Sequence, residues 1–283
     1  MYQHITVAPV AGALGAEVFG VDFTQPWKPE VFAEVKAAHL QYLVLFFRDQ
    51  KASDEDLARF ARNFGDLAVL PPHRQSPGLF PELLIIDKKP EDNLVFGWEW
   101  HSDTSHLPVP PMGSILAAHQ LPAFGGDTMF ANQYMAYDTL SQGMKDMLGH
   151  LKAVHSNGRI LSTLEADDVL EPGQGWGRTH TAHADISSVH PVVRTHPDTG
   201  RKALYVNTLH TERFENMTVS ESTPLLRYLF DHSTKPEFTC RLRWQPGTIA
   251  FWDNRCTQHL ALDDYPGQRR VMHRVQVRGT VPV

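Results

Sequence analysis

The chain has 283 residues, of which 42% are hydrophobic and 20% are charged, as in an ordinary soluble globular protein. Its formal net charge of −6 at pH 7 argues against a nucleic-acid-binding protein, which would normally carry a basic face, and against a polybasic protein of the membrane surface. No apolar run approaches the length of a membrane span, so we expect neither nucleic acid nor a membrane among its partners.

Cysteine and histidine usage give the first hints of location and chemistry. The two cysteines, Cys240 and Cys256, cannot form a disulfide framework and lack the C-x₂-C spacing of a zinc site. Residues 1–15 lack a basic stretch followed by an apolar core, so we expect no secretory signal and a cytoplasmic location. Sixteen histidines are many for this length and justify a search for a metal or acid–base site.

The first third of the chain predicts short strands and two helices. Residues 29–43 carry apolar side chains at helical spacing, and Ser53 is a suitable N-cap for a second helix through residue 64, ended by Gly65. The expected strands are apolar and bounded by turns, and they cover residues 15–22, 42–47 and 83–87.

From residue 113 onward, short strands separated by Gly and Pro turns predominate. They are expected at residues 114–118, 127–130, 189–195, 203–206, 238–244, 248–252 and 269–277. Helices interrupt them at residues 133–151, with Ser141 as a candidate cap, and at residues 219–232. This order predicts an α+β protein with a mainly β core, a sandwich or barrel. A jelly roll with covering helices is the preferred architecture.

The chain contains no internal repeat, low-complexity segment or linker-like stretch, so residues 1–283 are expected to form a single domain. Residues 159–188 differ from the rest, because they are polar, rich in glycine near the middle and without clear periodicity. A long stretch of this kind in a compact domain is often a lid. We expect these residues to form a flexible lid over the pocket.

His101 and Asp103 are the first pair with metal-ligand chemistry. At i, i+2 in an extended segment, their side chains lie on the same side. A distant histidine could complete the 2-His-1-carboxylate triad of non-haem Fe(II) sites, which leaves the opposite face of the metal open. By itself, however, His-x-Asp occurs often by chance, and a hydrogen-bonded surface turn is the commoner explanation.

The segment around His259 strengthens the metal hypothesis. His259 follows a predicted strand and a turn, and Arg270 and Arg274 lie on the next predicted strand. Residues four apart on a strand point to the same face, so both arginines would project inward if either does, while Arg269 would face outward. Buried guanidiniums need anionic partners, and Arg binds carboxylates and similar oxyanions in bidentate pairs. The alternative for any one of these arginines is a surface salt bridge.

In combination, these residues resemble the TauD/TfdA family of taurine and aryloxyalkanoate dioxygenases. His101-x-Asp103 is followed much later by His259 and then by Arg270, as in the family. Further matching segments are GGDT (125–128), VHPVVRTHP (189–197), KPEF (235–238), WDNR (252–255) and QRRVMHR (268–274). The likeness runs from about residue 12 to residue 279. Each motif is weak alone, but their order and spacing together are specific.

The resemblance implies a double-stranded β-helix that holds Fe(II) through His101, Asp103 and His259 and uses 2-oxoglutarate as cosubstrate together with O₂. Arg270 would pair with the distal carboxylate of 2-oxoglutarate, and the Thr128 hydroxyl would add a hydrogen bond to it. Enzymes of this family oxidise a C–H bond of their substrate and release succinate and CO₂. The family also favours a homo-oligomer.

Arg274 stands at the family position that holds the anionic head group of the substrate. Other pocket positions differ from the taurine enzyme in ways that remove polar contacts and leave more room beside the metal. These positions are Leu70, His73, Gly97, Thr104 and His210. We therefore expect hydroxylation of a small anionic substrate other than taurine, such as an alkyl sulfonate, a sulfate ester or an aryloxyalkanoate.

Three alternatives use the same residues differently. The iron centre could desaturate, epimerise or cyclise its substrate. A cupin-like isomerase or hydrolase would use zinc or manganese without 2-oxoglutarate, but Arg270 in an otherwise apolar barrel argues against it. A non-catalytic jelly-roll binding module would have no need of the complete triad.

Overall fold

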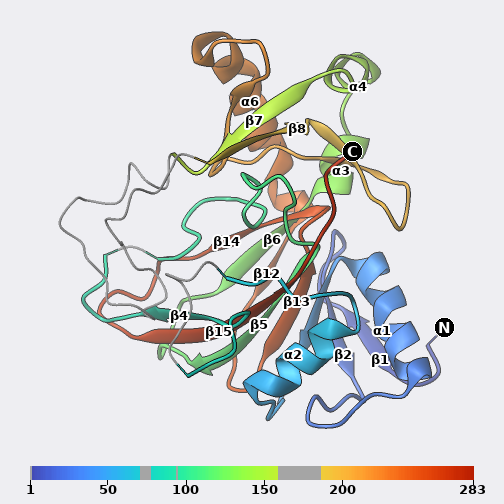
Figure 1. The fold of residues 1–283 in the computed structure, drawn as a ribbon, viewed down its shortest axis with the longest axis vertical. Coiled ribbons are helices and arrows are strands. Elements are labelled where there is room, and N and C mark those ends of the chain that lie inside the picture. Colours follow the sequence, from blue (N-terminus) through green and yellow to red (C-terminus); the bar gives the residue numbers. More distant parts are fainter. Residues whose placement is uncertain (1, 71–77, 94, 159–185) are drawn as a thin grey trace.

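The computed structural model describes residues 2–70, 78–93, 95–158 and 186–283. Within these residues, the largest element is a seven-stranded sheet (Figure 1). In spatial order it contains β1 (Thr6–Pro9), β2 (Ala16–Phe19), β3 (Val44–Phe47), β13 (Ile249–Asp253), β5 (Gly113–Gln120), β15 (Arg270–Val277) and β4 (Leu84–Lys88). Neighbouring strands are antiparallel except β2 and β3, which are parallel. Strands from the N-terminal and the C-terminal parts of the chain therefore pair within one sheet.

A second sheet packs against the first. It contains β12 (Thr239–Leu242), β6 (Thr128–Asn132) and β14 (Thr257–Ala261), which are antiparallel. Phe46, Leu116 and Trp252 of the large sheet share one buried cluster with Phe130 and Leu242 of the second sheet. Two sheets that bury their apolar faces against each other form the sandwich that the strand pattern predicted.

Two smaller sheets and three helices make up the upper part of the molecule in Figure 1. The sheets are β11 (Thr211–Phe214), β7 (Lys152–Ser156) and β8 (Ser187–Pro191), and β10 (Lys202–Leu204) with β9 (Val193–Thr195). The helices are α3 (Gln133–Asp138), α4 (Gln142–Leu148) and α6 (Val219–Ser233), and a short 3₁₀ turn covers Pro236–Phe238. Leu148, Leu204, Phe214 and Leu229 join these elements in a separate apolar cluster.

Helices α1 (Pro29–Tyr42) and α2 (Asp54–Arg62) cover the outer face of the seven-stranded sheet. Val35 and Phe60 from the helices pack with Phe47 and Phe251 from the strands. The inner face of the large sheet is therefore directed toward the second sheet, and the outer face is closed by helices.

Local signals in the sequence explain where several helices begin. Ser53 accepts a hydrogen bond from the Asp56 backbone N–H while the Asp56 carboxylate accepts one from the Ser53 N–H, a capping box that starts α2 as predicted. Ser141 caps α4, also as predicted. That cap begins a new helix, so the single helix expected over residues 133–151 is in fact two. The expected strand over residues 189–195 is likewise divided into β8 and β9.

Four strands, β1, β7, β11 and β14, were not predicted from the sequence. The most consequential is β14, where Thr257, Gln258 and His259 are all buried. Apolar periodicity cannot reveal such a strand, because its buried side chains are polar. Thr257 and Gln258 donate hydrogen bonds to backbone carbonyls, and the His259 ring packs beside the rings of Phe130 and Trp252.

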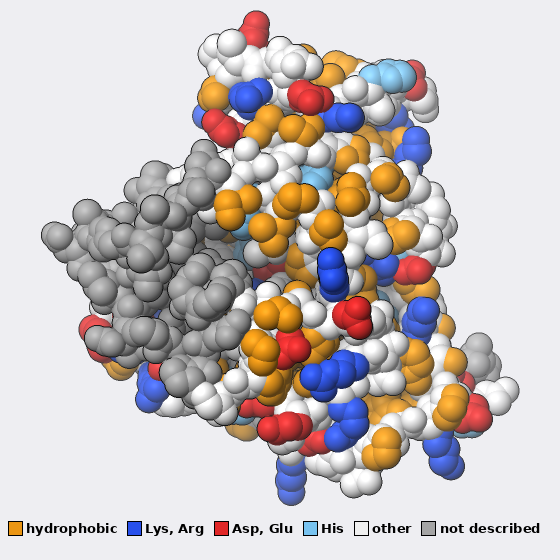
Figure 2. All heavy atoms as spheres, in the orientation of Figure 1, with side chains coloured by type: hydrophobic (Ala, Val, Ile, Leu, Met, Phe, Trp, Pro, Cys, Tyr) orange, Lys and Arg blue, Asp and Glu red, His pale blue; other side chains and the backbone are white. Residues whose placement is uncertain are grey.

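Of the lid predicted for residues 159–188, residues 159–185 lie outside the described residues, and Ser187 and Ser188 begin β8. None of the helices in the described ranges could span a membrane. On the face shown in Figure 2, basic and acidic side chains are interspersed, so this face carries no continuous basic patch.

Candidate metal centre

His101, Asp103 and His259 come together in the interior. Each can offer one ligand atom, and these atoms all lie within 4.8 Å of one another. His259 lies in the middle of β14, and His101 forms an isolated antiparallel bridge with it through two backbone hydrogen bonds of 3.1 and 2.8 Å. This pairing places the two imidazoles side by side, with ring centroids 4.1 Å apart. Both Nε2 atoms lie 3.8 Å from Oδ1 of Asp103.

The Asp103 carboxylate is held by several donors. The Ser114 hydroxyl donates to Oδ2 at 2.6 Å, and the Asn254 amide donates more weakly to the same oxygen at 3.4 Å. The Arg274 guanidinium donates to Oδ1 at 2.8 Å. Burial acts to raise the pKa of Asp103, but the Arg274 guanidinium is the largest of the opposing influences, and the pKa is held well below its usual range. The carboxylate is therefore ionised and ready to bind a cation.

The two histidines are suited to be neutral ligands. Burial lowers the pKa of both His101 and His259, which favours the uncharged imidazole. Nδ1 of His101 lies 2.7 Å from the Glu99 carbonyl oxygen. A proton on Nδ1 that donates to this carbonyl leaves the lone pair on Nε2, the atom that faces Asp103, as in many metal-binding histidines. Two neutral imidazoles and one carboxylate make a facial set that leaves further coordination positions open.

Arg270 is a buried cation without a matching carboxylate. Its exposed fraction is 6%, and no carboxylate of the described residues lies within ion-pair distance of its guanidinium. Nε of Arg270 has no hydrogen-bond partner there, and the guanidinium lies over the ring of Trp244 at 5.7 Å. Burial lowers the pKa of Arg270. Because an unpaired buried charge is costly, this site fits an anion supplied by a ligand.

Thr128 can take part in the same anion site. The Trp244 indole N–H donates to the Thr128 hydroxyl oxygen at 3.0 Å. The hydroxyl therefore keeps its own hydrogen for a further acceptor. Gly126 lies close by, since a Cβ atom at this position would come within 3.2 Å of the Arg270 side chain. A small carboxylate is the kind of group that these donors would accommodate.

Arg274 has a partner that the sequence did not predict. It lies on the same buried face of β15 as Arg270, as strand periodicity required, but it is paired with Asp103. Its guanidinium also lies 5.2 Å from the ring centre of Phe96, and its Nε has no hydrogen-bond partner among the described residues. Arg269 faces outward, as predicted, and pairs with Asp87.

Three of the other predicted pocket positions, Gly97, Thr104 and His210, lie near the metal ligands. Gly97 and His210 lie close to His101. A Cβ atom on Gly97, which has φ +81°, would come within 2.8 Å of Cε1 of His101, and the His210 ring centroid is 6.3 Å from that of His101. His210 is buried, and burial lowers its pKa well below the usual value. Thr104 directly follows Asp103 with φ +45°.

The structure does not show whether Leu70 and His73 line the site. Leu70 belongs to the buried cluster of the sandwich interior, together with Leu84 and Met272. His73 lies outside the described residues. Neither observation tests their predicted contact with a substrate.

Three residues beside the metal site were missed. Ser114 and Gln276 are paired across β5 and β15, and the Gln276 amide donates to the Ser114 hydroxyl at 2.9 Å. Asn254 accepts a hydrogen bond from the Trp252 indole at 3.0 Å. A usable signal existed, because polar side chains at the inward positions of otherwise apolar strands need a buried polar partner.

A family model described as "Taurine catabolism dioxygenase TauD, TfdA family" matches residues 6–276, nearly the whole chain. The chain belongs to this family. It is thus a non-haem Fe(II)- and 2-oxoglutarate-dependent dioxygenase, and the cofactor set inferred from the sequence is the one that this family uses. The triad fits the metal, and Arg270 with Thr128 fits the cosubstrate carboxylate.

Relatives and solved structures agree with this assignment. An alpha-ketoglutarate-dependent sulfate ester dioxygenase of Pseudomonas putida is 34% identical over 99% of this chain and 91% of its own length. An alkylsulfatase of Acinetobacter baylyi is 32% identical over 99% of this chain and 86% of its own length. The crystal structure of a taurine dioxygenase from Burkholderia xenovorans superposes with a TM-score of 0.82 at 34% identity, covering 99% of this chain and 93% of that one. The predicted jelly-roll fold is confirmed.

Proposed function

We propose that this dioxygenase hydroxylates a small organic anion, of the sulfate ester, alkyl sulfonate or aryloxyalkanoate type, and releases succinate and CO₂. One observation carries the proposal: Arg270 and Arg274 are both buried on the inward face of β15, and of the two only Arg274 has a carboxylate partner, Asp103, among the described residues. The positive charge of Arg270 is therefore available to an anion that a ligand supplies.

We propose that His101, Asp103 and His259 hold the iron. Their ligand atoms converge, the imidazoles are biased toward the neutral form, and the carboxylate is ionised. Bound Fe(II), with 2-oxoglutarate and O₂, supplies the oxidising chemistry that no side chain possesses. The surrounding hydrogen bonds from Ser114 and Asn254 orient the carboxylate toward the metal.

Charge balance supports a cosubstrate and a substrate that are both anionic. Fe(II) and the two arginines together carry four positive charges, against the single negative charge of Asp103. The two carboxylates of 2-oxoglutarate would leave one positive charge unmatched. A substrate with one sulfate, sulfonate or carboxylate group would neutralise it. We assign Arg270 and Thr128 to the distal carboxylate of 2-oxoglutarate, and Arg274 to the head group of the substrate.

The remaining pocket positions would shape the space beside the metal. Gly97 packs against the edge of the His101 ring, where a Cβ atom would not fit, and the buried His210 ring lies near that of His101 on another side. We propose that these two residues, with Thr104, Leu70 and His73, contact the organic part of the substrate. Among the anions, a sulfate ester is the first to test, because both relatives described above are named for that chemistry.

The proposal is tested by a screen for succinate release with Fe(II), 2-oxoglutarate and a panel of sulfate esters, alkyl sulfonates and aryloxy acids, with taurine included. We expect at least one of these anions to stimulate succinate release strongly and to be recovered as an oxidised product. Faster succinate release with taurine than with every other anion would contradict the substrate assignment. Stimulation by none of them would contradict the substrate class.

We also propose a cytoplasmic location and a homo-oligomeric state. The location is supported by Cys240 and Cys256, which are both buried and unpaired. Light scattering of the purified protein would measure the oligomeric state, and a monomer at micromolar concentration would contradict the second proposal.

A further inference from the structure

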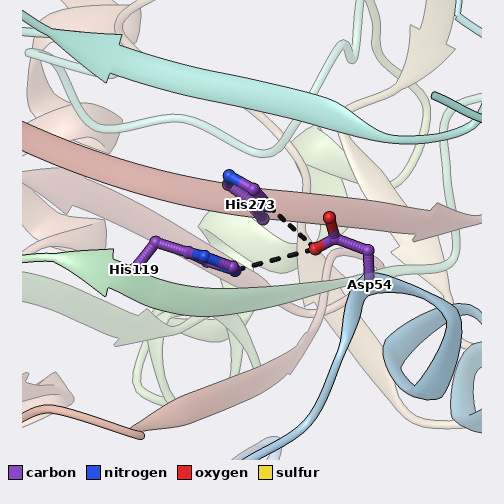
Figure 3. A group of neighbouring side chains, drawn as sticks. All are labelled: Asp54, His119 and His273. Carbon is purple, nitrogen blue, oxygen red and sulfur yellow. Dashed lines mark hydrogen bonds and ion pairs between the residues drawn. The ribbon is translucent and has the colours of Figure 1, made fainter. Parts of the chain in front are cut away.

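The two faces of the β4–β15 strand pair differ in how their charged side chains are partnered. On the outer face, Nδ1 of His273 is hydrogen-bonded to the Asp54 carboxylate at 2.8 Å, and the His119 ring stacks on the His273 ring (Figure 3). The Asp54 carboxylate therefore has its partner within the protein. On the inner face, Lys88 of β4 lies directly opposite Arg270 of β15 in the strand register. Both are buried, each with an exposed fraction of 6%, so two cations face each other there.

This pair of cations is costly in the absence of a ligand. Residues directly opposite each other in an antiparallel pair have Cβ atoms about 4.5–5.5 Å apart, and like charges in this arrangement destabilise the sheet. No carboxylate of the described residues lies within ion-pair distance of either cation. Asp127 and Asp264 both pair with Arg241, at 2.7 and 3.6 Å, so their remaining negative charge reaches Lys88 and Arg270 only at longer range. The pair is therefore suited to an anion that a ligand supplies.

Tyr265 lies near both cations. The Lys88 ammonium lies over the Tyr265 ring, 4.9 Å from its centroid, in a cation–π contact that helps to fix the position of the ammonium. The Tyr265 hydroxyl is buried and has no hydrogen-bond partner among the described residues. Burial raises the pKa of Tyr265 to about 12, so the hydroxyl is protonated and can donate. The charge of Arg270 acts on this pKa in the opposite direction, which places the guanidinium near the same side chain.

We propose that Lys88 is a second cationic residue of the cosubstrate site, and that it holds the distal carboxylate of 2-oxoglutarate together with Arg270. The inference rests on the assignment of Arg270 to that carboxylate under the proposed function. A carboxylate has two oxygens with about four lone-pair sites, so it can accept hydrogen bonds from Arg270, Thr128 and Lys88 at once. A carboxylate bound by both cations replaces their mutual repulsion with two attractions. Tyr265 positions the Lys88 ammonium for this contact.

The test is isothermal titration calorimetry of the Fe(II)-loaded full chain without O₂, with 2-oxoglutarate and with 2-oxopentanoate. The second compound has a methyl group in place of the distal carboxylate, so the preference for 2-oxoglutarate, as a ratio of the two Kd values, measures recognition of that carboxylate. We expect Lys88→Met to lower this preference at least about tenfold, as for the loss of one charge-assisted hydrogen bond. Its affinity for 2-oxopentanoate should not change. Lys202→Met, which removes the same charge from an exposed position of β10, is the matched control and should keep the wild-type preference.

Arg270→Gln, measured in the same way, separates this inference from the assignment on which it rests. If Arg270→Gln loses the preference for 2-oxoglutarate and Lys88→Met keeps it, Arg270 stays in the cosubstrate site and the role of Lys88 is overturned. If Arg270→Gln keeps the preference, the assignment of Arg270 is wrong and the role of Lys88 is overturned with it. An equal loss of preference in Lys88→Met and Lys202→Met would also overturn the proposal, because net charge rather than a contact would then explain the effect.

Discussion

Arg270 and Arg274 lie four residues apart on one face of the same strand, yet their surroundings differ. Arg270 has no carboxylate partner among the described residues, whereas Arg274 is paired with Asp103 at 2.8 Å. The difference indicates two kinds of anion site. Arg270 is ready for an anion from outside, while Arg274 already neutralises a metal ligand and can share its remaining donors with a substrate. Substitutions along this strand can test that contrast.

The largest effect is expected from Asp103→Ala. This change removes an iron ligand and leaves Arg274 buried without its partner, so activity should fall to background. The free energy of unfolding should drop by about 3–5 kcal/mol. Iron content and urea unfolding measure the two effects. Asp87→Ala is the control, because it breaks the exposed pair with Arg269, which should contribute less than about 1 kcal/mol. Equal losses in the two variants would contradict the distinction between buried and exposed pairs.

Arg270→Gln should raise the KM for 2-oxoglutarate by at least about 30-fold, as expected when one partner of a buried charge pair is removed. Its free energy of unfolding without ligand should be unchanged or higher, because the substitution deletes an unpaired buried charge. Arg269→Gln, next along the chain but facing outward, should leave the KM for 2-oxoglutarate unchanged. Steady-state kinetics measure the KM of the two variants, and urea unfolding measures their stability. Similar KM values for Arg270→Gln and Arg269→Gln would exclude Arg270 from the cosubstrate site.

Arg274→Gln should act in the opposite way on stability, and its effect should depend on pH. The folded-state pKa of Asp103 is depressed, so the stability it contributes is present above its unfolded pKa of about 3.9 and is lost as pH falls toward the folded value. Removing Arg274 raises the folded pKa. Acid unfolding should then begin at a higher pH than in the wild-type chain, as circular dichroism would show. An unchanged acid midpoint would mean that the ion pair contributes nothing.

The smallest effect is expected from Gly97→Ala. The substitution places a methyl group within 2.8 Å of the His101 ring and should weaken iron binding. Gly200→Ala is the matched control, since Gly200 also has a positive φ of +69° but has open space around its Cβ position. Both variants should lose about 1–2 kcal/mol from backbone strain, and only the first should lose iron affinity. Equal iron affinity in the two variants would show that the contact between Gly97 and His101 does not affect the metal site.

Much of this site could be predicted from the sequence because its ligands are widely spaced but chemically distinctive. His101, Asp103 and His259 form a recognisable set, and strand periodicity correctly placed Arg270 and Arg274 inside and Arg269 outside. Periodicity failed where burial is polar. Strand β14 and the donors Ser114 and Asn254 were missed because their buried side chains are polar and so leave no apolar pattern in the sequence.

Our central proposal is that the two arginines bind two different anions, 2-oxoglutarate and the substrate. The direct test compares succinate release with a medium-length alkyl sulfate ester and with the corresponding neutral alcohol, in the wild-type chain and in Arg274→Gln. We expect the wild-type chain to release succinate far faster with the sulfate ester than with the alcohol, and Arg274→Gln to lose most of that preference while keeping its KM for 2-oxoglutarate. Equal rates with the two compounds in the wild-type chain, or an undiminished preference in Arg274→Gln, would contradict it.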